Sequence, residues 1–355
     1  MSSIKEVARE AGVSTATVSH VINNTRYVSD EVRARVLKAI EQCRYYPNAH
    51  ARSLASGKSK IIGLVISDIV NPFFPELVKA IEAAAFERGY DIVLSNTNYD
   101  TGRTSHYVQR FIERKVAGVA VMTSEMDKRL VDELALREVP VVFLDVGEPG
   151  LHMNNLRVDY DEGIEQAILH LVALGHRRIA FIGGNTNLRS SLRRLEAFRK
   201  TMRQLFPAAP ELVFYGNFRI EGGQRAASEI LAAERRDLPT AVVCANDLTA
   251  IGAISEFEAA GLNVPRDISV VGFDNIAFAA LTKPALTTVN LPLNELGRRA
   301  IEVLIRSVED SEQQGIEVRI PTNLIIRQST APARIQPDGD GGGKGKKRNL
   351  VKQII

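Results

Sequence analysis

The feature that most constrains the fold is the alternation of short β-branched runs with longer helical stretches between residues 61 and 330. The runs with the length of a strand are residues 61–67, 91–95, 116–122, 139–145, 178–183, 212–215, 240–245 and 268–273. Apolar residues at helical spacing lie between them, for example in residues 75–88, 162–174, 192–205 and 248–260. This alternation predicts two doubly wound parallel-sheet subdomains, with a ligand where the carboxyl ends of their strands meet.

Composition narrows the class of protein. An apolar share of 45% and a charged share of 25% are typical of soluble globular chains. No apolar run reaches the roughly 18–20 residues that a membrane span needs. The charged start, MSSIKEVARE, lacks the pattern of a secretory signal. The two cysteines, Cys43 and Cys244, lie far apart and indicate neither a disulfide framework nor a metal cluster. We therefore expect a cytoplasmic protein.

The net charge of +3 is unevenly distributed, with +5 on residues 1–60, +4 on residues 331–355 and −6 on residues 61–330. A basic head on an acidic body predicts that the head binds a polyanion, although a solvated basic surface has the same balance. Residues 331–355 are rich in Gly and Lys, which predicts a disordered tail. This tail either strengthens nonspecific DNA binding or is a solvated extension.

The first 45 residues predict three short helices. Ser3 and Glu6 have the spacing of a capping box, and Gly12 is placed to end the helix that begins there. Ser14 and Ser29 are good N-caps for a second and a third helix. A tight glycine turn between the first two helices is typical of a helix-turn-helix, although a purely structural three-helix bundle has the same outline.

Longer motifs in this region resemble the DNA-binding head of the LacI/GalR family. The run V-A-x-x-A-G-V-S-x-x-T-V-S starts at Val7, and Tyr46-Pro47-Asn48 and the hinge sequence A-R-S-L-A follow it. So long a match indicates membership rather than chance. Within the family, T-V-S-H-V-I-N is most similar to the ribose and purine repressors, among which many members have Arg in place of His20.

The resemblance implies roles in DNA binding. Thr15, Ala16 and His20 would face the major groove, where His20 is able to donate to purine N7 or O6. Arg26 would add a base contact. The residues that would clamp phosphates or cap helices locally are Ser14, Ser19, Asn23 and Tyr45. Residues 48–56 would form a hinge helix only on the operator, from which Leu54 would wedge into the minor groove.

The resemblance extends over nearly all of residues 1–330. It implies an all-α helix-turn-helix head and an α/β body similar to periplasmic sugar-binding proteins, whose chain crosses between two lobes more than once. The implied division is a DNA-binding domain at 1–47, a hinge at 48–59, an effector-binding and dimerisation domain at 60–330, and a disordered basic tail at 331–355.

Polar and aromatic residues at the predicted strand ends match the ligand contacts of the family. They are Asn71, Phe73, Phe74, Asp145, Arg194, Phe218, Asn246, Asp274 and Asn290. Sugars need this mixture, because aromatic rings cover C–H faces while carboxylates, amides and a guanidinium bind hydroxyls. Phe73 and Phe74 also fit the core, and Asp145 and Asp274 also fit helix caps. We expect Asn246 to contact the ligand and Asp247 to cap the next helix.

Two departures from relatives alter the polarity or size of the pocket, so ribose itself is only one candidate for the effector. Val146 stands where ribose binders have Arg and the purine repressor has Trp, and Asn290 stands where relatives usually have Gln. The N-P-F-F element at Asn71 is absent from the purine repressor, which argues against a purine corepressor. The predicted effector is therefore a sugar, such as a pentose, that acts as an inducer, although the sequence leaves a corepressor open.

These patterns together predict a homodimeric repressor on palindromic operator DNA, with dimer contacts from helices 75–88 and 248–260. The sequence has no histidine pair of zinc type, no G-x-G-x-x-G loop and no assignable catalytic set, so we predict no metal, no cofactor and no enzymatic activity. The rival interpretation is an α/β enzyme or sugar carrier with an accessory head. A catalytic nucleophile would favour the enzyme, and a secretory signal would favour the carrier.

Overall fold

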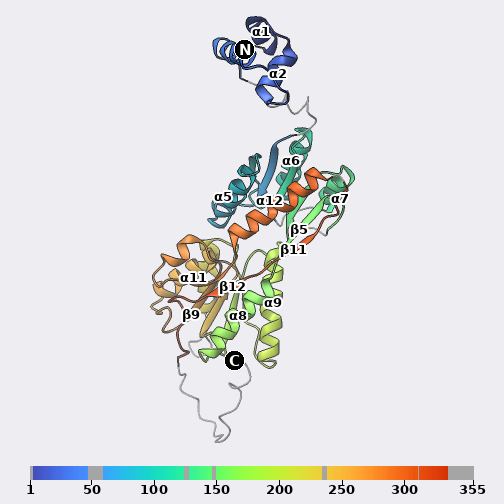
Figure 1. Ribbon diagram of the computed structural model, residues 1–355. Coiled ribbons are helices and arrows are strands. Elements are labelled where there is room, and N and C mark those ends of the chain that lie inside the picture. Colours follow the sequence, from blue (N-terminus) through green and yellow to red (C-terminus); the bar gives the residue numbers. More distant parts are fainter. Residues whose placement is uncertain are drawn as a thin grey trace, which may run out of the picture. The chain divides into compact units, whose positions relative to one another are not determined.

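The computed structural model in Figure 1 describes residues 3–46, 59–123, 128–145, 149–233, 238–310 and 312–334. The chain divides into two compact units, a head of residues 1–61 with 115–117, and a body made of the remaining residues. No helix within the described ranges is long and apolar enough to span a membrane. The expected hinge helix and the wedge residue Leu54 fall on residues 47–58, outside the described part.

The head consists of three helices, α1 (Ile4–Ala11), α2 (Thr15–Asn23) and α3 (Asp30–Gln42). The predicted capping box is present, since the Ser3 side chain accepts from the Glu6 amide and the Glu6 side chain accepts from the Ser3 amide. Gly12 ends α1 with a left-handed φ of 64°, and the Ser14 side chain caps α2. The apolar sides of the helices meet in a core centred on the fully buried Val7, Val18 and Val36.

The body contains two sheets of six strands each, and we call the sheets and their helices lobe 1 and lobe 2 (Figure 1). The lobe 1 sheet, in spatial order, is β11 (Glu317–Ile320), β5 (Met153–Val158), β4 (Val141–Leu144), β3 (Gly118–Met122), β1 (Ile61–Ile66) and β2 (Asp91–Asn96). Its helices are α5 (Phe73–Phe86), α6 (Thr101–Glu113), α7 (Lys128–Leu136) and α12 (Leu293–Glu309).

The lobe 2 sheet, in spatial order, is β12 (Asn323–Ile325), β10 (Thr287–Asn290), β9 (Ser269–Asp274), β8 (Ala241–Cys244), β6 (Ile179–Gly183) and β7 (Val213–Tyr215). Its helices are α8 (Tyr160–Ala173), α9 (Arg189–Leu205), α10 (Ile220–Leu231), α11 (Asp247–Ala259) and the 3-10 helix η2 (Ala277–Ala280). The pairs β6–β7, β6–β8, β8–β9 and β9–β10 are parallel, and only the short β12 pairs in the antiparallel sense, with β10. The predicted doubly wound fold is therefore confirmed.

All eight predicted strands form, and the structure adds β5, β10, β11 and β12. The polar sequence of β5, M-N-N-L-R-V, does not suggest a buried strand. Asn154 is nevertheless buried there, because its amide donates to the Val141 carbonyl at 3.3 Å and to Ser307 Oγ at 3.0 Å. Those hydrogen bonds offset the cost of removing the amide from water.

Within the described residues the chain crosses between the lobes three times, from β5 to α8, from β10 to α12 and from β11 to β12. The second crossing places α12 beside α5, on the lobe 1 sheet (Figure 1). Gly297 permits this approach, because a Cβ at that position would lie 2.7 Å from the Cβ of Ala80. The expectation that the chain crosses more than once is confirmed, and the crossings bring the carboxyl ends of both sheets to a common cavity.

Candidate functional site

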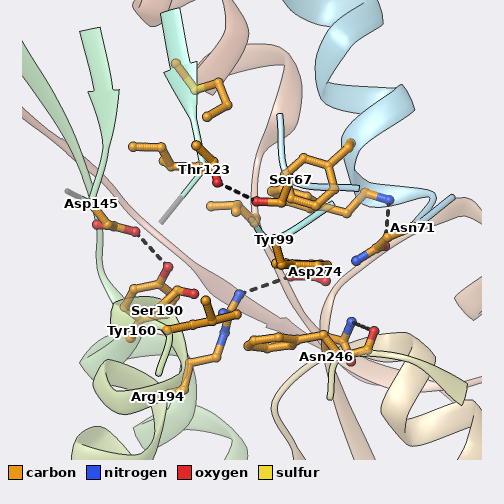
Figure 2. A pocket seen from close by; sticks show the side chains of 17 residues that line it. Ser67, Asn71, Tyr99, Thr123, Asp145, Tyr160, Ser190, Arg194, Asn246 and Asp274 are labelled. Atoms are coloured by element: carbon orange, nitrogen blue, oxygen red, sulfur yellow. Dashed lines mark hydrogen bonds and ion pairs between the residues drawn. The ribbon is translucent and has the colours of Figure 1, made fainter. Parts of the chain in front are cut away.

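A cavity of about 70 Å³ lies where the carboxyl ends of β1, β3 and β4 of lobe 1 meet those of β8 and β9 of lobe 2 (Figure 2). Eight of the nine predicted effector-contacting residues line it: Asn71, Phe73, Phe74, Asp145, Arg194, Phe218, Asn246 and Asp274. All of them except Asp145, which is half-buried, are buried. The lining thus brings two carboxylates, a guanidinium, amides and aromatic rings into one cavity.

Arg194 is the central cation of this cavity. Its Nη2 lies 3.3 Å from Asp274 Oδ1, and both side chains are buried. The guanidinium also packs on the rings of Tyr160, Phe218 and Phe273 at 4.7, 5.5 and 4.5 Å. Its Nε has no hydrogen-bond partner among the described residues. Arg194 is therefore held rigidly by its surroundings and keeps a donor for a ligand.

Asp145 and Asp274 are the two acids of the cavity. Tyr160 Oη donates to Asp145 Oδ2 at 2.7 Å (Figure 2), and the Val158 amide donates to Asp145 Oδ1 at 2.8 Å. Burial raises the pKa of Asp145 to about 6, although the Tyr160 hydrogen bond opposes the shift. Burial likewise raises the pKa of Asp274 to about 7, against the opposing charge of Arg194. Both carboxyls therefore change charge close to neutral pH.

Asn246 and Asp247 divide their roles differently from the prediction. Asn246 itself caps α11, because its Oδ1 accepts from the Thr249 amide at 3.0 Å, and its Nδ2 donates to the Phe218 carbonyl at 3.0 Å. The fully buried Asp247 accepts from Thr288 Oγ1 at 2.5 Å and from the Ile276 amide at 2.8 Å. The expectation that Asp247 is the cap is wrong. Its carboxylate instead fixes the segment that follows Asp274.

Asn290 is the predicted contact that does not line the cavity. Its Oδ1 accepts from Asn275 Nδ2 at 2.9 Å, and its Nδ2 donates to Asn323 Oδ1 at 3.1 Å. Both ends of the amide are therefore engaged next to the crossings of the chain between the lobes. Leu291, one residue later, lines the cavity. Asn290 therefore lies outside the lining of this cavity.

Sequence reasoning missed several lining residues, of which Tyr160 is the most consequential. It begins α8, directly after β5 has crossed out of lobe 1, and it contacts both Asp145 and Arg194. Ser67 and Thr123 were missed as well, and the Ser67 hydroxyl donates to Thr123 Oγ1 at 2.8 Å (Figure 2). For Ser67 and Thr123 the available signal was position, since Ser67 ends one predicted strand and Thr123 follows another.

The head presents the predicted DNA-contacting residues on one side of α2. Thr15 and Ala16 are exposed, Ser19 and His20 are half-buried, and Arg26 in the following turn is exposed. The local contacts include a hydrogen bond from Asn23 Nδ2 to Ser19 Oγ at 3.2 Å and one between His20 Nδ1 and Thr25 Oγ1 at 2.9 Å. Small polar side chains on an exposed helix face permit a close approach to base edges.

Comparison with known proteins identifies the family. The family model described as bacterial regulatory proteins, lacI family, matches residues 3–48, and a periplasmic binding protein-like domain matches residues 168–330. The HTH-type transcriptional repressor PurR of Photobacterium profundum is 37% identical over 331 residues, which is 93% of this chain and 98% of that protein. The chain belongs to the LacI family. A PurR repressor of Aliivibrio fischeri is 35% identical to this LacI-family chain over 333 residues, 93% of the chain and 99% of the relative.

Solved structures agree with this assignment. A lac repressor dimer bound to operator and the anti-inducer ONPF superposes on the LacI-family chain with a TM-score of 0.83 and 28% identity, over 93% of this chain and 99% of that one. A LacI family regulator from Enterococcus faecium with bound ribose has a TM-score of 0.68 and 28% identity, over 77% and 100%. This LacI-family protein is a DNA-binding transcriptional repressor and not an enzyme.

Proposed function

We propose that the effector of this repressor is a small uncharged sugar, such as a pentose, which binds in the cavity of the body and acts as an inducer. The observation that carries the proposal is the pairing of acids and aromatic rings in one cavity. Asp145 and Asp274 supply acceptors, and the rings of Phe73, Phe74 and Phe218 supply apolar faces. Each sugar hydroxyl carries a donor hydrogen and each C–H face is apolar, so both kinds of lining are used.

The arrangement of donors also fits a polyol. The Nε of Arg194 faces no acceptor among the described residues, and a hydroxyl or ring oxygen would supply one. Phe73 and Phe74 meet edge to face, with ring centroids 5.0 Å apart and planes at 85°, so only one of them can lie flat against a ligand ring. The ribose bound to the relative from Enterococcus faecium supports the same class of ligand.

The PurR relatives favour a second candidate, a purine base. A flat purine has aromatic faces that stack well on phenylalanine, but a purine without an amino group, such as hypoxanthine, carries fewer donors than a pentose does. A lining with two carboxylates is matched better by the ligand with more donors. We therefore place the sugar first and treat the purine as its competitor in every binding experiment.

Isothermal titration calorimetry with D-ribose, three other pentoses, hypoxanthine and guanine tests the effector. Fluorescence anisotropy on palindromic DNA from the upstream region of the gene then measures how the bound ligand changes operator affinity. We expect a pentose to bind and to release the operator. A ligand does so only if it prefers the state with the lower operator affinity. A purine that binds and tightens the operator complex would overturn both the sugar and the inducer assignment.

For operator binding we infer that Thr15, Ala16, His20 and Arg26 contact base edges, and that Ser19 contacts a phosphate. We also propose a division into a DNA-binding domain at 1–47, a hinge at 48–59 that folds on DNA, a body at 60–330 and a tail at 331–355, at the start of which Ala331 and Ala333 hydrogen-bond to the body. Leu54 of the hinge is proposed to wedge into the minor groove. Leu54→Ala is expected to weaken specific binding about tenfold while changing nonspecific binding little, since one inserted side chain is lost.

We infer that a second copy of this chain covers an apolar groove of the body. The groove is lined by α11 residues and by large exposed side chains, among them Val70, Phe278 and Leu281, which are 80, 54 and 73% exposed. LacI-family repressors form dimers, as the operator-bound lac repressor does. Of the two helices predicted to make the contact, this groove includes residues of α11 but none of α5.

Sedimentation velocity tests the dimer contact. Leu281→Asp is expected to convert the dimer to monomer, because it places a charge in an apolar interface. Leu136→Asp is the matched control, since Leu136 is an equally apolar side chain, 85% exposed, on α7. If the Leu281→Asp protein remains dimeric, the dimer interface lies outside this groove.

A further inference from the structure

Thr25 lies beside the proposed base-reading residue His20, although it follows the recognition helix. The helix α2 ends at Asn23, and its C-cap Asn24 has a left-handed backbone with a φ of 50° that turns the chain back. Thr25 Oγ1 is thereby brought to 2.9 Å from His20 Nδ1. Arg33 of α3 donates to Asn24 Oδ1 at 3.0 Å, so the third helix holds the turn in place. The contact is therefore built into the head rather than made by a free side chain.

The hydrogen bond has a consequence for the chemistry of the ring. A neutral imidazole carries one N–H, and the partner of one nitrogen determines whether the other is a donor or an acceptor. Thr25 Oγ1 has no other hydrogen-bond partner among the described residues, and its 2.9 Å contact fits a hydroxyl that donates to Nδ1 as well as one that accepts from it. With Nδ1 as the acceptor, the proton of the ring is on Nε2.

We propose that Thr25 is a positioning residue that fixes His20 as a hydrogen-bond donor through Nε2, and so selects a purine acceptor at one position of each operator half-site. The proposal rests on the proposed base contact of His20. An Nε2–H group is able to donate to purine N7 or to guanine O6, but is not able to accept from the amino group of cytosine or adenine. Without the Thr25 hydroxyl both tautomers are open, and the preference should weaken.

The first step of the test finds the base position. A duplex library with a randomised half-site is selected with the full-length repressor and with its His20→Ala variant. His20 contacts the base position at which the original protein shows a base preference and the His20→Ala variant shows none. If His20→Ala keeps every preference of the original protein, the proposed base contact of His20 fails, and the role of Thr25 fails with it.

The second step tests Thr25 with modified bases at that position. Replacing the purine by its 7-deaza form removes N7, and 2-aminopurine in place of guanine removes O6. We expect one of these changes to weaken binding by the original protein about tenfold, the size of one good base contact. Thr25→Val, which has the same shape without the hydroxyl, should lose most of that difference. Thr25→Ser, which keeps the hydroxyl, should restore it.

Each remaining outcome overturns the proposal. If Thr25→Val discriminates the modified bases as the original protein does, while His20→Ala does not, then His20 reads the base without help from Thr25. If Thr25→Val weakens binding equally on all duplexes, including random DNA, the hydroxyl serves only the structure of the head. If neither modified base weakens binding by the original protein, Nε2 is not the donor.

Discussion

The two candidate binding surfaces of this repressor are built in opposite ways. The proposed base contacts of the head lie between residues 15 and 26, on one short helix and the turn after it, and are exposed or half-buried. The effector cavity draws residues from positions as far apart as Ser67 and Leu291, and most of its polar side chains are buried. A buried polar group without a partner raises the energy of the fold, whereas an exposed one is hydrated. Substitutions of the proposed base contacts should therefore change binding alone, whereas substitutions in the cavity should change binding and stability together.

Arg194→Ala should have the largest effect, because it removes a ligand donor and also leaves the buried Asp274 without its cation. Breaking a buried ion pair costs about 3–5 kcal/mol. Losing a charged hydrogen-bond donor weakens binding by about 100-fold. Calorimetric unfolding and titration with the identified effector measure the two losses separately. The matched control is Arg193→Ala, since Arg193 is the preceding residue of α9 and is exposed. Stability losses of equal size in both variants would contradict the argument from burial.

A change of pH should act on the cavity in two opposite directions. The pKa values of Asp145 and Asp274, raised by burial to about 6 and about 7, exceed the value near 3.8 of a free aspartate. The folded state therefore binds protons more tightly than the unfolded state. The contribution of these two groups to stability falls as pH rises from about 4 to about 7. Sugar hydroxyls donate best to ionised carboxylates, so affinity should rise as pH passes the pKa values of the folded state, up to about pH 8.

The affinity change is large enough to measure. If binding needs both carboxylates ionised, affinity should fall by about 20-fold between pH 8 and pH 6, most of it from Asp274. Titration calorimetry across that range gives the slope, and Asp274→Asn should flatten it. An affinity that is constant from pH 6 to pH 8 would show that the ligand does not require the two ionised acids.

Tyr160→Phe should have a smaller effect. It removes the hydroxyl that donates to Asp145 at 2.7 Å but keeps the ring under Arg194. The hydrogen bond lowers the pKa of Asp145, so its loss should raise that pKa further and shift the pH dependence of effector binding upward. We expect affinity near pH 7 to fall about fivefold, as for one hydrogen bond to a charged group. An unchanged pH profile would contradict the coupling.

The same contrast explains what could be predicted from the sequence. The capping box of Ser3 and Glu6 and the turn at Gly12 involve residues a few positions apart, so local rules suffice. The cavity residues Asp145 and Asp274 were predictable because each lies at the carboxyl end of a strand of a parallel sheet. Asn290 also ends a strand, yet its amide meets Asn275 and Asn323 instead of the cavity. An amide pairs equally well with a ligand or with another amide, and only the packing of distant segments decides between them.

Ser14→Ala should have the smallest effect and should remain within the head. The Ser14 hydroxyl caps α2 by accepting from the Thr17 amide at 3.1 Å, and losing such a cap costs about 1 kcal/mol. Hydrogen exchange of the α2 amides should become faster, and operator affinity should fall slightly on all sequences, while effector affinity stays unchanged.

Ser14→Asn restores a capping side chain without adding charge, so it should restore protection of α2. If Ser14→Asn fails to do so, Ser14 does not act as a cap. If either variant changes effector affinity, the two surfaces are coupled even without DNA, and the separation of local from long-range effects no longer holds.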